Sequence, residues 1–228
     1  MSLTHKAVTY TIKGLGSLLC RVDVKELTKV PAQGPLILVC NHVNFLDIIL
    51  YPHLQPRQVT GFAKSETWDN PALGSLFSLW EAIPLRRGEP DASAIQRGLQ
   101  ALKAGKIVVI TPEGTRSGHG RLQRGFPGVV VLGLHTQAPL MPLVFYGAET
   151  YRKNLTRLQR SDFNVRVGQA FHIDPQGEHV NRQVRQEIAD EIMFELADLL
   201  PERYRGVYNT PRPYPPRFLR YLQETSFA

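Results

Sequence analysis

From residue 35 onward, short apolar runs alternate with segments of helical spacing, and this alternation constrains the fold more than any other feature of the sequence. Residues 35–40 are entirely apolar, as expected for a strand buried on both faces, and residues 91–104 have the spacing of a helix. Further strand-like runs lie at residues 58–63, 82–85, 106–111, 140–146 and 163–173, and further helical patterns follow residue 127 and span residues 181–200. The alternation predicts a single α/β domain with a mostly parallel central sheet flanked by helices.

The two ends of the chain differ from this middle part. We expect an N-terminal amphipathic helix in residues 1–30, the α/β domain in residues 31–200, and a basic, Pro-rich tail in residues 201–228 that wraps over the domain or contacts a partner rather than extending the sheet. The net charge is +7, and each end contributes +3, from five basic and two acidic residues. Positive charge at both ends suits docking on an anionic surface, either a membrane or a nucleic acid.

The first segment has one apolar stripe on a helical wheel, with basic residues opposite. The stripe contains Val8, Ile12, Leu15 and Leu19, and Lys13 lies on the basic side. These residues fit contact with a membrane interface, and the stripe fits packing on the protein's own core equally well. No apolar run reaches the roughly 18–20 residues that span a bilayer, and no secretory signal is present. We therefore expect a soluble or peripheral protein.

The strongest chemical signal, residues 41–47, follows the first buried strand directly. His42 and Asp47 lie five residues apart beyond the carboxyl end of a strand, where functional groups collect in α/β sheets. A carboxylate that orients the imidazole leaves the other ring nitrogen free to take a proton from a substrate hydroxyl. No Ser or Cys nucleophile stands beside the pair, which favours direct attack by that hydroxyl over a covalent intermediate. Taken alone, the spacing also fits a structural histidine with a capping aspartate.

A glycine-rich, basic loop follows the strand-like run at residues 106–111. Residues 112–120 read PEGTRSGHG, and two more arginines follow at positions 121 and 124. Glycines let the backbone approach a ligand, and forked arginine donors match phosphate oxygens, although a solvated surface turn has the same composition. Lys64 and Arg87, at the ends of two further strand-like runs, fit either ligand binding or ordinary surface charge.

Together these motifs resemble the glycerolipid acyltransferase family, best known through the 1-acylglycerol-3-phosphate acyltransferases. The four ordered blocks of that family match residues 41–47, 82–88, 113–116 and 140–145, within a resemblance that covers roughly residues 35–175. The resemblance implies that His42, held by Asp47, deprotonates a lysolipid hydroxyl, which attacks the thioester of acyl-CoA or acyl carrier protein. It also implies a set of acceptor-binding residues: Lys64, Arg87, Glu113, Gly114, Thr115 and Arg116.

The expected product of this chemistry is phosphatidic acid, and the reaction needs no metal and no bound cofactor beyond its acyl-CoA or carrier-protein co-substrate. Two alternatives stay open. Phe126 stands where many members of the family carry a lysine, which favours a different lysolipid acceptor, such as a lysophospholipid or lyso-ornithine lipid. The other alternative is a non-catalytic lipid-binding module. The sequence lacks aromatic RNA-recognition motifs and a basic recognition helix, so we expect no nucleic-acid partner. We expect peripheral association with membrane lipids at the cytoplasmic face of the cell membrane.

Overall fold

The computed structural model describes residues 3–54, 56–86, 88, 91–136, 138–212 and 215–223. The strands are β1 (Cys20–Asp23), β2 (Leu36–Cys40), β3 (Val59–Lys64), β4 (Ile83–Leu85), β5 (Ile107–Ile110), β6 (Leu140–Tyr146), β7 (Ser161–Val167), β8 (Phe171–Ile173) and β9 (Leu219–Tyr221). The α-helices are α1 (Leu3–Leu19), α2 (Leu50–His53), α3 (Pro71–Leu79), α4 (Ala92–Lys103), α5 (Gly128–Thr136), α6 (Tyr151–Thr156) and α7 (Arg182–Leu199). The 3₁₀ helices are η1 (Lys25–Lys29), η2 (Phe45–Ile49), η3 (Ser65–Asp69), η4 (Glu202–Tyr204) and η5 (Gly206–Tyr208).

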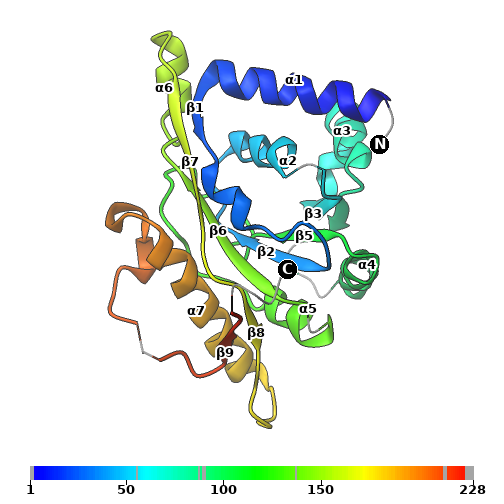
Figure 1. Ribbon diagram of the computed structural model, residues 1–228, viewed down its shortest axis with the longest axis vertical. Helices are drawn as coiled ribbons and strands as arrows, with labels where there is room; N and C mark the ends of the chain where they lie inside the picture. Colours follow the sequence, from blue (N-terminus) through cyan, green and yellow to red (C-terminus); the bar gives the residue numbers. More distant parts are fainter. Residues whose placement is uncertain are drawn as a thin grey trace.

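All described strands belong to one twisted sheet, with the order β1-β7-β6-β2-β5-β3-β4 along its main path (Figure 1). Strands β6, β2, β5, β3 and β4 run parallel to one another, whereas β7 is antiparallel to β6. The predicted α/β domain with a mostly parallel sheet is confirmed. Because parallel strands end at the same edge of a sheet, the residues that follow β2, β3 and β5 are brought together there.

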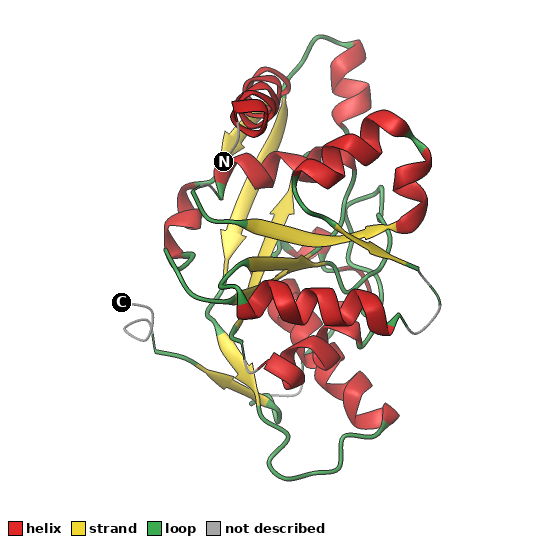
Figure 2. Cartoon of the chain, turned by 90° about the vertical axis from the view of Figure 1, so that its right-hand side faces the viewer, coloured by secondary structure: helices red, strands yellow, loops and turns green. Residues whose placement is uncertain are grey.

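Strand β2 lies at the centre of two apolar cores, one on each face of the sheet. All five of its side chains are buried, and alternate residues point to opposite faces. Ile37 and Val39 pack with residues of α4, α5 and α7, whereas Leu36, Leu38 and Cys40 pack with residues of η2, β1 and β7. Helices accordingly cover both sides of the sheet (Figure 2). This two-sided burial explains why the sequence of β2 is a continuous apolar run.

The structure corrects two expectations about the ends of the sheet. The strand-like stretch at residues 163–173 forms two strands, β7 and β8, which both pair antiparallel with β6. The expectation that the C-terminal tail does not extend the sheet is wrong, because β9 pairs antiparallel with β8. The N-terminal segment also contributes a strand, β1, which pairs parallel with β7. Strands of three or four residues are too short to show the alternation by which a sequence reveals them.

Helix α1 is the predicted amphipathic helix, and it lies across one side of the molecule, next to α2 (Figure 1). Val8, Ile12 and Leu19 are partly buried, and Gly16 lies so close to Ile49 that an added Cβ would be 3.0 Å from its Cγ1 atom. These three residues of the predicted stripe are thus on the side of α1 that contacts α2 and η2, which favours packing on the protein's own core over membrane contact for them. Of the five residues assigned to the membrane, Leu15 and Lys13 are exposed. None of the helices described by the structure is both long and apolar enough to cross a membrane.

Candidate active site

His42 and Asp47 form a hydrogen-bonded pair at the carboxyl end of β2. The distance between His42 Nδ1 and Asp47 Oδ2 is 2.6 Å, and the two side chains are 19% and 13% exposed. Within the described part of the chain, Nε2 of His42 has no hydrogen-bond partner. The geometry therefore orients the imidazole through one nitrogen and leaves the other nitrogen available to a ligand.

The local fold holds the Asp47 carboxylate in place. Asp47 is in the first turn of η2, where its Oδ2 accepts hydrogen bonds from the backbone N–H groups of Val43 at 2.8 Å and Asn44 at 3.1 Å. Asn44 caps the same helix by accepting from the Leu46 N–H, and its side-chain amide donates to the Ala148 carbonyl oxygen. Burial raises the pKa of the Asp47 carboxyl, and the contacts with His42 and the backbone N–H groups oppose that rise. The carboxylate is thus fixed by several contacts besides the one with His42.

Glu113 lies beneath the pair and is 2% exposed. Its Oε1 accepts a hydrogen bond from the backbone N–H of His42 at 2.8 Å, and its Oε2 accepts one from the backbone N–H of Gln123 at 2.9 Å. Burial raises the pKa of the Glu113 carboxyl to about 7, in spite of these hydrogen bonds. The resemblance implied that Glu113 binds the acceptor, but both oxygens are occupied by backbone donors. The structure therefore gives Glu113 a positioning role.

The glycine-rich segment, residues 113–125, is called the site loop below. Its backbone lies against that of the His42 region, because Ser117 N–H donates to the His42 carbonyl oxygen at 2.8 Å and Gly118 N–H donates to that of Val43 at 2.9 Å. Gly114 and Gly118 have φ values of +65° and +70°, in the left-handed region that favours glycine. Thr115 and Arg116 lie between these glycines and are exposed. The loop therefore presents an exposed hydroxyl and an exposed guanidinium near the His42–Asp47 pair.

Lys64 and Gly114 line the same cavity, which has a volume of about 130 Å³. Lys64 ends β3, and its ammonium group forms an ion pair with the exposed Glu66 at 2.8 Å. Most of the other lining is apolar: Phe62, Ala63, Leu85, Ile110, Pro112, Phe126 and Val129. Arg87, the other predicted cation of this region, lies outside the described residues. Of the predicted acceptor-binding residues, Lys64, Gly114, Thr115 and Arg116 are thus placed around one edge of the sheet.

Sequence reasoning assigned no role to Asn41, although it belongs to the same motif. Its side-chain amide is buried, donates to the Phe145 carbonyl oxygen at 2.9 Å and accepts from the Phe145 N–H at 3.0 Å. These two bonds join the end of β2 to β6 where the ladder between the two strands has ended. A buried asparagine directly after an apolar strand was the signal for this role, because such a side chain needs partners for both ends of its amide.

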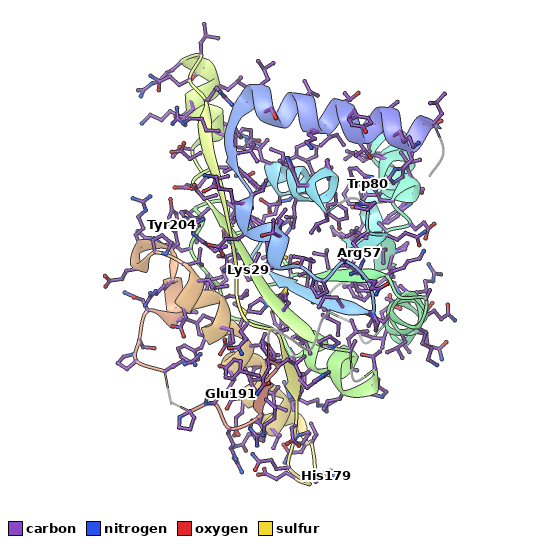
Figure 3. The ribbon with its side chains drawn as sticks, in the orientation of Figure 1. Lys29, Arg57, Trp80, His179, Glu191 and Tyr204 are labelled. Atoms are coloured by element: carbon purple, nitrogen blue, oxygen red, sulfur yellow. The ribbon has the colours of Figure 1, made fainter. Side chains whose placement is uncertain are left out.

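The C-terminal segment, residues 201–208, holds the site loop from the other side. Leu122 N–H donates to the Tyr204 carbonyl oxygen at 2.9 Å, and the Gly125 N–H donates to the Tyr208 hydroxyl at 3.1 Å. The Tyr208 hydroxyl in turn donates to Asp190 of α7 at 3.0 Å. Figure 3 places Tyr204 beside the upper end of α7, on the segment that follows that helix. The first part of the tail therefore wraps over the domain as predicted, and it supports the site loop.

We expect Gly206→Ala to lower the free energy of unfolding by about 2–4 kcal/mol, because the new methyl group overpacks and the backbone is left-handed. Gly206 has a φ of +55°, and an added Cβ would lie 2.0 Å from the Leu122 carbonyl oxygen. Gly177→Ala is the matched control, because Gly177 also has a positive φ but faces open space. That variant should lose only about 1 kcal/mol. Equal losses in urea titrations of the two variants contradict the close contact between residues 206 and 122.

Three comparisons with known proteins indicate which family the chain belongs to. A family model described as Acyltransferase matches residues 21–146. A 1-acyl-sn-glycerol-3-phosphate acyltransferase of Bacillus subtilis is 28% identical over 170 residues, which cover 74% of this chain and 82% of the relative. A relative of the same name from Cocos nucifera is 31% identical over 182 residues, which cover 77% of this chain and 57% of the relative.

A solved structure shows that the fold is shared. The 1-acyl-sn-glycerophosphate acyltransferase PlsC from Thermotoga maritima superposes with a TM-score of 0.62 at 21% sequence identity, over 86% of this chain and 79% of that chain. Across the described residues, the structure has no group of three or more His, Cys, Asp or Glu side chains that is arranged to hold a metal ion. Because the family model matches more than half of its residues, the chain belongs to the acyltransferase family.

Proposed function

We propose that the chain transfers a fatty acyl group from acyl-CoA or acyl carrier protein to the free hydroxyl of 1-acylglycerol-3-phosphate, giving phosphatidic acid. The observation that carries the proposal is the contact of 2.6 Å between His42 and Asp47, beside a loop on which Arg116 is exposed. The site thus combines a base for a hydroxyl with a cation for a phosphate. The names of the curated relatives agree with this activity.

In this proposal His42 acts as the general base through Nε2. Asp47 accepts the hydrogen bond from Nδ1–H and so selects the tautomer in which Nε2 carries the lone pair. Nε2 removes the hydroxyl proton as the acceptor oxygen bonds to the thioester carbon, and the resulting imidazolium returns the proton to the sulfur when the C–S bond breaks. The acyl group passes directly to the acceptor, with no acyl-enzyme.

The acceptor's phosphate is assigned to the edge of the sheet around the site loop. Arg116 offers a forked donor, Thr115 a hydroxyl and Lys64 an ammonium group, and the backbone at Gly114 permits close approach. Arg87, which lies outside the described residues, is kept in this set because its sequence position predicts it. A phosphate held there fixes the acceptor's hydroxyl near His42, and such positioning accelerates a reaction between two substrates strongly.

Peripheral association with the cytoplasmic face of the cell membrane is part of the proposal, and we assign it to the outer face of α1. Leu3, Tyr10 and Leu18 lie on one side of that helix, with exposures of 85%, 71% and 69%. Leu15 and Lys13 border this face. An exposed apolar face flanked by cations suits the interface between acyl chains and headgroups.

The proposal is tested by an acyl-transfer assay in mixed micelles, with acyl-CoA and acyl carrier protein as alternative donors. The acceptors are lysophosphatidic acid and a panel of other lysolipids. We expect transfer to lysophosphatidic acid. Transfer only to another lysolipid means that the acceptor is not 1-acylglycerol-3-phosphate. In that case Phe126, which is 62% exposed and lines the same cavity as Lys64 and Gly114, is the residue expected to cause the different acceptor preference. Folded protein that transfers to no acceptor contradicts the proposal and favours a non-catalytic lipid-binding module.

The same assay tests the phosphate assignment through Arg116→Ala. We expect this variant to raise the KM for lysophosphatidic acid by about 10- to 100-fold, the range for a lost hydrogen bond between charged groups. The KM for the acyl donor should not change. Arg97→Ala, which removes an exposed arginine from α4, is the control. An unchanged acceptor KM in Arg116→Ala removes that residue from the phosphate site.

A further inference from the structure

A second cavity is lined by residues of α1, of the β1–η1 segment and of α2. Helices α1 and α2 lie on the other side of the sheet from α7 (Figure 1). The cavity has a volume of about 660 Å³, and it is called the α1 groove below. Apolar residues form much of its wall: Val22, Val24, Leu27, Pro52 and Pro56. None of the predicted catalytic or acceptor-binding residues that the structure describes lines it, so the α1 groove is separate from the proposed active site.

Three lysines surround the α1 groove. Lys6 and Lys13 lie two turns apart on one flank of α1, and Lys25 lies at the start of η1 on the opposite wall. Among the described residues, none of the three forms an ion pair. The single acidic residue of the lining, Asp23, is 3.6 Å from the guanidinium of Arg166 and is partly neutralised by it. The groove therefore presents unbalanced positive charge above an apolar wall.

His53 adds a polar group to the inner end of this surface. Its Nδ1 atom is buried and has no hydrogen-bond partner among the residues that the structure describes. Burial and the nearby Lys13 ammonium lower the pKa of His53. An anion bound in the groove places a negative charge near Lys13. It also offers a hydrogen-bond acceptor to the buried ring nitrogen of His53.

We propose that the α1 groove binds the headgroup of an anionic phospholipid. A lipid fits better than a free anion, because the groove combines cations with apolar walls and an amphiphile satisfies both. Tyr10 lines the groove and also belongs to the exposed apolar face of α1, so a bilayer in contact with that face lies beside the groove's opening. The inference rests on the membrane association proposed above, and it does not depend on the chemistry at His42.

Binding is tested first without a membrane, by titrating soluble dihexanoyl phosphatidic acid into the full chain. The imidazole resonances of His53, assigned by their absence in His53→Gln, report on the groove. We expect a saturable shift with this lipid and none with dihexanoyl phosphatidylcholine or with inorganic phosphate at the same concentration. Absence of a shift overturns the proposal, and an equal shift with inorganic phosphate replaces it with a simple anion site.

Flotation with vesicles then tests whether the three lysines act at a membrane. The substitutions Lys6→Gln, Lys13→Gln and Lys25→Gln are combined in one variant, and Arg97→Gln, Lys103→Gln and Arg182→Gln form a control with the same change in net charge. On phosphatidylcholine vesicles that contain phosphatidic acid, we expect the groove variant to bind about 100-fold more weakly. The affinity of the control variant for these vesicles should fall only a few-fold, because its charges lie far from the groove. Equal losses in both variants overturn the proposal.

These outcomes separate the α1 groove from the acyl-transfer chemistry. If phosphatidic acid shifts the His53 resonance of the wild-type chain but the chain transfers no acyl group, the result supports lipid binding in the groove and refutes the proposed activity. A chain that transfers acyl groups in micelles without a His53 shift refutes the groove alone. Failure of the wild-type chain to float with the vesicles that contain phosphatidic acid, with the His53 shift intact, leaves lipid binding in place and refutes the membrane association assigned to α1.

Discussion

Replacing His42 by alanine is expected to lower kcat for acyl transfer by about three orders of magnitude, within the range measured for a lost general base. The imidazole is the group in the described site whose free nitrogen can take the hydroxyl proton, and its partner Asp47 is held by backbone donors that the substitution leaves in place. His42 is partly exposed, so its removal leaves no sealed cavity. The fold should therefore survive, and a single-turnover assay on folded protein measures the loss.

Two further variants sharpen this result. Asp47→Asn keeps the shape of the side chain but replaces one acceptor oxygen by an amide that donates, so kcat should fall while the KM for the acceptor stays near its original value. His135→Ala removes an exposed histidine from α5 and serves as the control. If His42→Ala keeps more than a tenth of the original kcat, His42 is not the general base.

Glu113→Gln is expected to lower kcat by about 10- to 100-fold, because a displaced reacting group loses rate steeply. The carboxylate accepts from the backbone N–H groups of His42 and Gln123 through its two oxygens. The glutamine side chain has one oxygen, so its NH₂ group faces one of these donors, and the buried donor left without a partner costs about 1–3 kcal/mol. The loop that carries His42 then loses one of its anchors.

The same variant changes how stability depends on pH. The pKa of Glu113 is raised from an ordinary value of 4.5 to about 7, so the folded protein holds a proton that the unfolded chain releases between these pH values. Wild-type stability therefore falls by about 3 kcal/mol across this window as the pH rises, whereas Glu113→Gln lacks this loss. The difference in the free energy of unfolding between the wild type and the variant, in favour of the wild type, should be largest near pH 4.5 and smallest above pH 7.

Urea titrations at several pH values measure this difference between the two proteins. The other titrating groups largely cancel in the comparison, because both proteins share them. Glu202→Gln, which removes an exposed carboxylate, is the control and should follow the wild type at every pH. A difference between wild type and Glu113→Gln that is independent of pH contradicts the raised pKa of Glu113.

The sequence was sufficient to predict features of the fold and the site that depend on one local element. The long apolar runs of β2 and β6 are buried on both faces, and His42 and Asp47 meet because η2 begins between them. It was insufficient to predict features that depend on contacts between residues far apart in the sequence. The burial of Glu113 requires the backbone of His42, and the orientation of α1 is set by Ile49, which lies against Gly16.

Prediction of the C-terminal strand failed for a related reason. Strand β9 has only three residues, and its place in the sheet is set by pairing with β8, which is equally short. Neither strand has an alternating pattern long enough to be seen in the sequence. The proline residues of the preceding stretch indicated an irregular connection and gave no information on where that connection ends.

The contacts of the C-terminal segment with Leu122 and Gly125 also determine when the enzyme becomes complete during its synthesis. Residues 201–208 leave the ribosome late, long after His42, Asp47 and the site loop have emerged. A nascent chain thus carries His42 and Asp47 well before the backbone N–H groups of Leu122 and Gly125 can donate to Tyr204 and Tyr208 and hold the loop. A protein released by a premature stop codon before residue 201 has helix α1 but an unsupported site loop. Support of the site loop is in this way tied to translation through residue 208.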